Sequence, residues 1–252
     1  AKFDWIGFAP VFEDEKISGN VYKSQRIVDL ETKDKLDSIS RQVFNGMYIR
    51  PIPGTKDEVI SIFDLYNKNK KTAKVLTYQQ ANETAIKLEE IKDYKIIHLA
   101  THGAINEMFP ELSAILLSQD STQKTDTLNV MLGNVAQQNE GFLYESEIYN
   151  LNLNANLVVL SACETGLGKM SAGEGVIGIS RAMIYAGADN LIVSLWAVND
   201  IATKYLMIAF YNDLLQNKNQ RKYSKSLRYA KLEMIKQGLI PYFWSPFILI
   251  GQ

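Results

Sequence analysis

The sequence contains one strongly apolar run that ends at a reactive side chain, Leu157-Val158-Val159-Leu160-Ser161-Ala162-Cys163-Glu164-Thr165-Gly166. Four consecutive apolar residues, with β-branched valines at their centre, are typical of a strand covered on both faces, as in a parallel sheet. Open α/β sheets bind their ligands beyond the carboxyl ends of the strands. We therefore expect Cys163, the only cysteine of the chain, to lie at a ligand-binding edge.

A second predicted strand, residues 94–101, also ends at a reactive side chain, because it leads directly into His102-Gly103. The chain has two histidines, His98 and His102. His102 is the better partner for Cys163, since it lies at the strand exit and precedes a glycine, whereas His98 lies inside the strand. The two-residue period of a strand places both imidazoles on one face, with His98 deeper.

Composition narrows the classes of function. The chain has 252 residues, 46% of them apolar, which is ample for a core, and a formal net charge of −1. A sequence pI near 6.2 provides no basic surface for nucleic acid. A single cysteine excludes an internal disulfide, and no apolar run approaches the ~18 residues of a membrane span. We expect a reducing, cytoplasmic location and no binding to nucleic acid or membrane.

Strands and helices alternate about six times along the sequence. Further strands are predicted at 3–9, 73–77, 190–196 and 247–250, and helices at 56–66, 82–91, 145–151, 176–186, 201–215 and 224–236. Residues 13–50 are interpreted as a loop-rich insertion and 114–118 as part of a hairpin. Such alternation favours a three-layer α/β fold with a mainly parallel sheet. One domain covering 1–252 is expected.

Three helix starts carry capping residues. Thr55 with Glu58 fits a capping box, and Asn82 and Asp200 fit ordinary N-caps. The chain begins without a methionine and almost directly in a strand, so we expect it to be a piece of a longer protein.

No cofactor or metal is expected. Gly173-Glu174-Gly175-Val176-Ile177-Gly178 matches the dinucleotide fingerprint as a string, but it does not open directly on a strand, and it puts a carboxylate where a pyrophosphate would lie. A metal site is equally poorly supported, because the sequence offers no second cysteine and no suitably spaced histidines.

A Cys/His pair at two strand ends predicts nucleophilic catalysis. A thiol with a pKa near ~8.5 is only a few per cent thiolate at neutral pH, and a neighbouring imidazole raises that share. Backbone N–H groups of Gly103 and Cys163, freed where the strands stop, would stabilise an oxyanion. The alternative stays open that Cys163 is a small buried apolar residue and that His102 is structural.

Several segments together resemble the CHAT family, a caspase-like domain of the caspase and separase clan that often follows tetratricopeptide repeats. The histidine motif corresponds to His98-Leu99-Ala100-Thr101-His102-Gly103 and the cysteine motif to Leu160-Ser161-Ala162-Cys163-Glu164-Thr165-Gly166. Ala186-Gly187-Ala188, Ser194-Leu195-Trp196 and Trp244-Ser245-Pro246-Phe247 also resemble family segments, in the same order.

The resemblance implies a caspase-like fold, a sheet of about six mainly parallel strands with helices on both faces. It further implies a cysteine endopeptidase with His102 as general base or acid, Cys163 as nucleophile, and Gly103 with Cys163 in the oxyanion hole. The substrate would be a protein, bound along Ser194-Leu195-Trp196, and an upstream repeat or regulatory segment would restrain the site. The alternative is a protein-interaction module of the same fold in which the pair is idle.

Two further expectations concern selectivity and gating. Asp200, four positions after Trp196, would select a basic residue before the scissile bond, unless it is only the N-cap of the following helix. The glycine-rich loop 164–175 would gate the site, since glycines permit large backbone changes.

Overall fold

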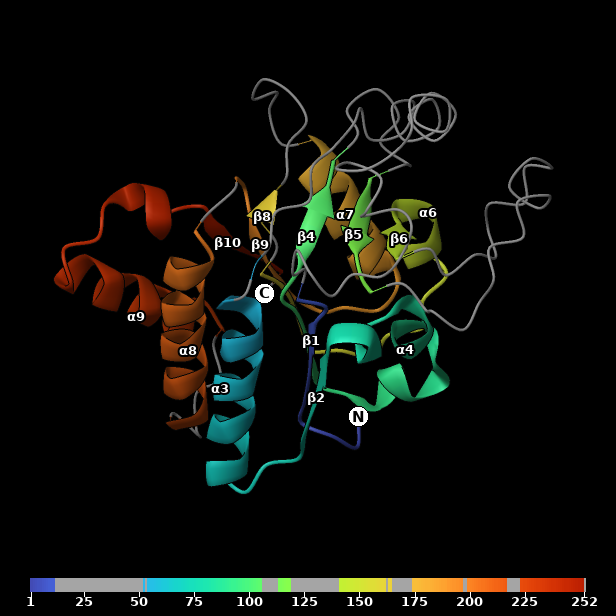
Figure 1. Ribbon diagram of the computed structural model, residues 1–252, viewed down its shortest axis with the longest axis horizontal. Helices are drawn as coiled ribbons and strands as arrows, with labels where there is room; N and C mark the ends of the chain where they lie inside the picture. Colours follow the sequence, from blue (N-terminus) through green and yellow to red (C-terminus); the bar gives the residue numbers. More distant parts are fainter. Residues whose placement is uncertain are drawn as a thin grey trace, which may run out of the picture.

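In the part of the chain that the computed structural model describes, six strands form a central sheet (Figure 1). The described residues are 1–11, 52, 54–105, 113–118, 141–161, 163–164, 174–196, 199–216 and 223–251, with 163–164 and 174–176 described by their backbone alone. In spatial order the strands are β10 (Phe247–Ile250), β9 (Leu191–Ser194), β7 (Leu157–Leu160), β3 (Ile96–Leu99), β1 (Trp5–Ala9) and β2 (Ala73–Thr77). Only β10 within this sheet runs antiparallel to its neighbour.

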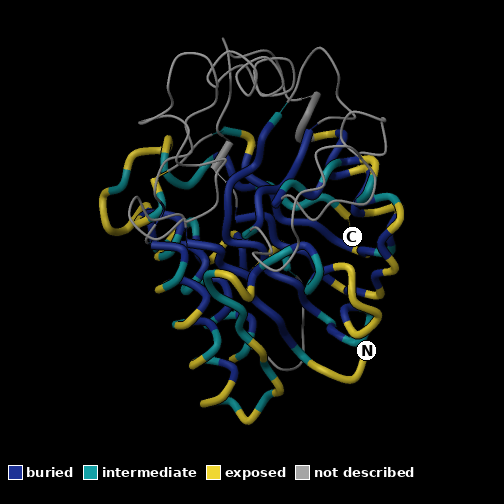
Figure 2. The backbone as a smooth tube through the Cα atoms, turned by 45° about the vertical axis from the view of Figure 1, so that its right-hand side comes forward, coloured by how far each residue is buried: buried dark blue, intermediate teal, exposed yellow. Residues whose placement is uncertain are grey.

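Helices cover both faces of this sheet (Figure 1). One layer contains α3 (Gly54–Lys68), α8 (Asp200–Gln216) and α9 (Tyr223–Lys236), and the other contains α4 (Glu83–Lys87), α6 (Glu145–Ile148) and α7 (Glu174–Tyr185). The four central strands β1, β3, β7 and β9 are buried at every position, which Figure 2 shows as a dark interior. The predicted three-layer α/β fold is confirmed.

Alternation along the strands divides the core in two. Ile96 of β3 and Ala100, the residue after β3, belong to the apolar cluster under α3, α8 and α9. Ile97 and Leu99 of β3 belong to the cluster on the side of α4, α6 and α7. Burial of apolar side chains on both faces is what a strand between two helix layers requires. The apolar runs in the sequence therefore predicted these strands correctly.

A second, smaller sheet continues from the carboxyl ends of β3 and β7. Its order is β6 (Phe142–Tyr144), β5 (Ala114–Leu116), β4 (His102–Ala104) and β8 (Cys163–Glu164). β4 and β8 are parallel, while β5 is antiparallel to both β4 and β6. Figure 1 shows these strands above the ends of the central strands. The sequence predicted only part of one hairpin here.

The helix caps only partly match the expectations. Asn82 is confirmed as an N-cap, since its side chain accepts a hydrogen bond from the Ala85 N–H at 2.9 Å, but α4 ends at Lys87 and a 3₁₀ helix, Glu89–Asp93, follows. The capping box is wrong: Thr55 lies inside α3 and its hydroxyl donates to the Ile52 carbonyl. The Glu58 carboxylate is used elsewhere, as described below.

Asp200 is not the N-cap of α8 either. That role belongs to Asn199, whose side chain accepts from the N–H groups of Ile201 at 3.0 Å and Ala202 at 3.2 Å. Asp200 is instead the first residue of the helix.

Some expectations fall outside the described residues, namely the insertion at 13–50 and, within the expected gating loop 164–175, residues 165–173. Among the residues that are described, the helices are too short or too polar for any of them to cross a membrane.

Candidate functional site

His102 and Cys163 are register partners on adjacent parallel strands. β4 pairs with β8 so that the Cα of His102 lies opposite that of Cys163 and Gly103 opposite Glu164. Upstream, Leu99 pairs with Leu160 between β3 and β7. In each pair the two members are 61 positions apart in the sequence. β4 and β8 therefore continue the register of β3 and β7 across the break, the short interval where pairing stops between the two sheets.

Hydrogen bonds hold the break itself in place. The Ser161 N–H donates to the Leu99 carbonyl at 3.0 Å, and the Ala100 N–H donates to the Phe8 carbonyl at 2.9 Å. The buried Thr101 hydroxyl donates to the Leu116 carbonyl of β5. The chain can therefore leave one sheet and enter the next without losing the alignment of the two strand ends.

The surroundings of His102 and Gly103 differ from the expectation that both strands stop at the site. His102 is only 1% exposed, and Gly103 lies within β4, flanked by Ile115 of β5 and Glu164 of β8. The strands continue for one or two residues past the candidate pair.

The second histidine belongs to a buried polar network. His98 Nε2 lies 2.8 Å from Oε1 of Glu58, and the Ser161 hydroxyl donates to the same oxygen at 2.6 Å. His98 Nδ1 lies 3.1 Å from the Tyr211 hydroxyl. Each of these four residues is at most 3% exposed, so α3 and α8 are joined to β3 and β7 by side chains with no access to bulk water.

Burial also fixes the protonation of Tyr211. Removal from water is the main reason that the pKa of its hydroxyl is well above the usual value, and the nearby Tyr66 and Glu58 act in the same direction. The phenol therefore keeps its proton and serves as a neutral donor. Aromatic rings surround it, with Trp5, Tyr66 and His98 at centroid distances of 6.3, 6.0 and 5.6 Å.

The predicted substrate-binding residues lie at the other side of β7. Ser194 ends β9, which is flanked by β7 and β10, and its hydroxyl donates to the Trp196 carbonyl at 2.6 Å. The Leu195 N–H donates to the Pro246 carbonyl at 3.1 Å. Trp196 is partly buried and its indole N–H donates to the Tyr242 carbonyl at 3.2 Å. The backbone of this segment is therefore already engaged on the β10 side.

Asp200 joins two helices. Its Oδ2 accepts a hydrogen bond from the Gly54 N–H at the start of α3, at 3.0 Å. Lys204, one turn later, pairs with Asp57 at 3.4 Å.

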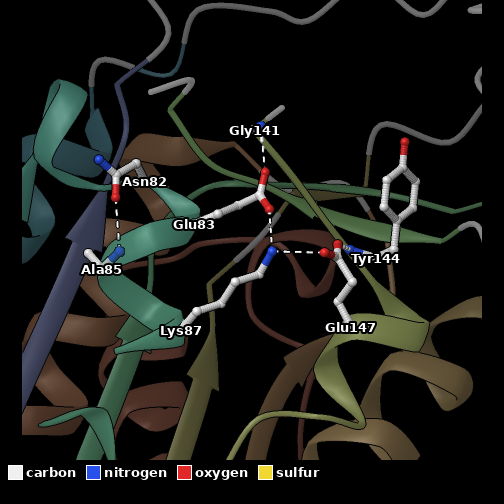
Figure 3. A network of polar contacts seen from close by, with 7 residues as sticks. All are labelled: Asn82, Glu83, Ala85, Lys87, Gly141, Tyr144 and Glu147. Atoms are coloured by element: carbon white, nitrogen blue, oxygen red, sulfur yellow. Dashed lines mark hydrogen bonds and ion pairs between the residues drawn. The ribbon is translucent and has the colours of Figure 1, made fainter. Parts of the chain in front are cut away.

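A third network holds the outer edge of the small sheet (Figure 3). Glu83 of α4 is fully buried; its carboxylate accepts from the Gly141 N–H at 2.6 Å and pairs with Lys87 at 2.7 Å. Lys87 also pairs with Glu147 at 2.8 Å, and Glu147 accepts from the Tyr144 N–H at 3.0 Å. Both ends of β6 are thus tied to α4.

Among the described residues no cluster of three or more His, Cys, Asp or Glu side chains could hold a metal ion. A cavity of about 250 Å³ lies at the amino ends of the strands, lined by Asp4, Tyr66, Asn69, Lys71, Lys95, Ile96, Asn156, Leu214, Leu215 and Tyr223. It is at the opposite edge of the large sheet from His102 and Cys163.

Glu58 and Tyr211 were missed from the sequence as members of a polar network. A signal for Glu58 existed: it lies four and eight positions before Ile62 and Tyr66, on the buried face of its helix. A carboxylate on an apolar helix face requires a buried partner. Tyr211 carried no such signal, because tyrosine is common in apolar cores.

Comparison with known proteins gives matches at two levels. The family model of the CHAT domain matches residues 14–252. Tetratricopeptide repeat protein 28 of Mus musculus and its counterpart in Homo sapiens are each 36% identical over 115 residues, which is 45% of this chain and 4% of theirs. The match therefore spans a small fraction of those relatives. The architecture of the present chain, mixed α/β with a mostly parallel six-stranded sheet, is consistent with a caspase-like fold. The chain belongs to the CHAT domain family.

Proposed function

We propose that this chain, residues 1–252, is a single caspase-like domain that acts as a cysteine endopeptidase, with Cys163 as nucleophile and His102 as general base and acid. The register of β4 and β8 carries the proposal, because it sets His102 opposite Cys163. Neighbouring strands lie about 4.8 Å apart, a separation at which an imidazole can reach a thiol.

In the proposed reaction His102 takes the thiol proton, and the Cys163 sulfur attacks the carbonyl carbon of a peptide bond. The C–N bond then breaks, and His102 returns the proton to the leaving amine. An acyl-thioester remains. Water, deprotonated by His102, attacks the thioester, which releases the carboxylic acid and restores the thiol. No metal or cofactor takes part in these steps.

Backbone groups would stabilise the oxyanion that forms in both steps. We assign this role to the N–H groups of Gly103 and Cys163, as the family resemblance implies. Gly103 lies within β4 between β5 and β8, and Cys163 is the first residue of β8.

Substrate binding is assigned to Ser194, Leu195 and Trp196, with Asp200 as the selector of a basic residue. An extended peptide would add to the segment beyond Val193, where the pairing of β9 with β7 ends. The substrate is proposed to be one or a few protein partners.

The repeat proteins that match this chain support a further part of the proposal. A tetratricopeptide-like segment upstream of the domain would hold the site in an unproductive state, in a cytoplasmic protein. Family membership also supports a second function, a protein-interaction module of caspase-like fold whose Cys/His pair is idle.

Substitution of the pair separates the two functions. Cys163→Ala and His102→Ala should each remove nearly all cleavage of a protein substrate, and the double variant should lose little more, because residues that act as one unit are not additive. Residual cleavage by Cys163→Ala would exclude Cys163 as the nucleophile, whereas an idle pair predicts that wild type does not cleave. Loss of cleavage in Trp196→Ala, with the reactivity of Cys163 toward iodoacetamide unchanged, is expected for a residue that binds substrate.

A further inference from the structure

The buried network around Glu58 lies directly beneath the candidate catalytic pair. Ser161 is two residues before Cys163, and His98 is four residues before His102. Both side chains bind the same carboxylate oxygen, Glu58 Oε1, at 2.6 and 2.8 Å. One side chain of α3 therefore contacts both strands on which the pair depends.

The place of this contact matters because regular pairing is interrupted there. β3 and β7 end at Leu99 and Leu160, and β4 and β8 begin at His102 and Cys163. Between these points the two segments of the chain are aligned by the Ser161 N–H, which donates to the Leu99 carbonyl. The Glu58 bridge adds a side-chain link at the same level of the sheet.

The donors and acceptors of the network are matched. The Ser161 hydroxyl donates to Glu58 Oε1, and the His98 tautomer that carries its proton on Nε2 donates to the same oxygen. Tyr211, whose hydroxyl keeps its proton, donates to His98 Nδ1 across 3.1 Å. Buried polar groups that satisfy one another in this way resist displacement, because a shift of either strand would leave a buried donor or charge unbonded.

We propose that Glu58 is a positioning residue that, through Ser161 and His98, fixes the spacing of Cys163 and His102. This inference rests on the proposed function for its catalytic consequence. The alignment of the strand ends is a separate physical claim, so each can be tested by its own measurement.

A matched pair of serine variants provides the test. Ser161→Ala removes one donor to Glu58. Ser226→Ala is the control, because Ser226 is also 3% exposed and donates to a carboxylate, Asp213, at 2.8 Å, but it joins α8 to α9 away from the strand ends. We expect urea unfolding to show similar destabilisation of both variants.

Two measurements then separate positioning from general stability. The rate of alkylation by iodoacetamide reports on Cys163 alone, since the chain has no other cysteine. It should fall about tenfold in Ser161→Ala and stay within about twofold of wild type in Ser226→Ala. Amide hydrogen exchange at 99–103 and 157–164 should accelerate only in Ser161→Ala.

A second variant keeps the test informative if Ser161→Ala proves too unstable. Glu58→Gln retains an acceptor oxygen and nearly the same shape, and should give an intermediate loss of Cys163 reactivity. Equal exchange rates at the strand ends in Ser161→Ala and Ser226→Ala would overturn the positioning role. An alkylation rate that does not change in His102→Ala would overturn the proposed function instead, and the exchange measurement would still decide the role of Glu58.

Discussion

The two sheets of the molecule are held together by different means. In the large sheet the strands have four or five residues, and the four central ones are buried between two apolar clusters. In the small sheet the strands have only two or three residues. Ile115 and Leu143 join the apolar core there, and side chains add links to main-chain groups, such as Thr101 to Leu116 and Glu83 to Gly141. The longer strands therefore lie in the large sheet, whereas the candidate catalytic residues lie in short strands whose apolar packing is supplemented by side-chain hydrogen bonds.

Overpacking the large sheet should have the largest effect. Gly7 leaves room for the fully buried Trp5 indole, and a Cβ at this position would lie 2.2 Å from its Cη2 atom. Because the ring is enclosed, we expect Gly7→Ala to lower the free energy of unfolding by about 3 kcal/mol. Chemical denaturation measures this change.

The control for Gly7→Ala is Gly238→Ala. Gly238 has open space around it and a φ of +78°, so the variant should cost only the backbone strain, about 1 kcal/mol. Equal losses at the two positions would contradict the role of the indole contact.

Breaking a link in the small sheet should cost less and act locally. Glu83→Ala leaves the Gly141 N–H without its carboxylate and Lys87 with one partner fewer. We expect a loss of about 2 kcal/mol and faster hydrogen exchange in β5 and β6, with β3 and β7 little changed. Glu233→Ala, which removes an exposed pair with Lys236, should cost between about 0 and 1 kcal/mol.

The stability contributions of one carboxylate beside each sheet, Glu83 and Asp4, should depend on pH with opposite signs. Burial raises the pKa of Glu83, and its bonds to Lys87 and Gly141 offset this only in part. The folded state then binds the proton more tightly than the unfolded state, so the stability contributed by Glu83 falls as pH rises through its raised pKa.

Asp4 beside the large sheet behaves in the reverse way. Burial raises its pKa, but the hydrogen bonds from Lys95 and Thr72 and the charges of Lys95 and Lys71 lower it by more. Its contribution is lost as pH falls through the lowered pKa. As pH rises to about 4, the usual pKa of an aspartate, the stability difference between wild type and Asp4→Asn should grow and then level off. As pH rises further, above the usual glutamate pKa of about 4, the difference between wild type and Glu83→Gln should shrink. Parallel slopes for the two variants would contradict this assignment.

The same contrast explains what could be predicted from sequence. Strands such as Leu157–Leu160 are buried on both faces and are therefore visible as apolar runs. β4 and β8 have too few residues for any periodicity, so only the reactive residues His102 and Cys163 marked their position. The Glu58 network could not be predicted in full, because its members come from α3, β3, α8 and the residue after β7 and meet only after the large sheet has formed.

Substitution of Asp200 should have the smallest effect on stability. It tests whether a helix beside the large sheet contributes to substrate selectivity. Its carboxylate accepts from the Gly54 N–H, and Asn at this position keeps an acceptor oxygen in the same place. Asp200→Asn should therefore change the free energy of unfolding by less than about 1 kcal/mol. Cleavage of a peptide library measures the second property: a selector acid predicts loss of Lys and Arg before the scissile bond, because the negative charge is gone. An unchanged preference would mean that Asp200 only links α8 to α3, through Gly54, which lies four residues before Glu58. Substrate selection would then depend on the strand ends.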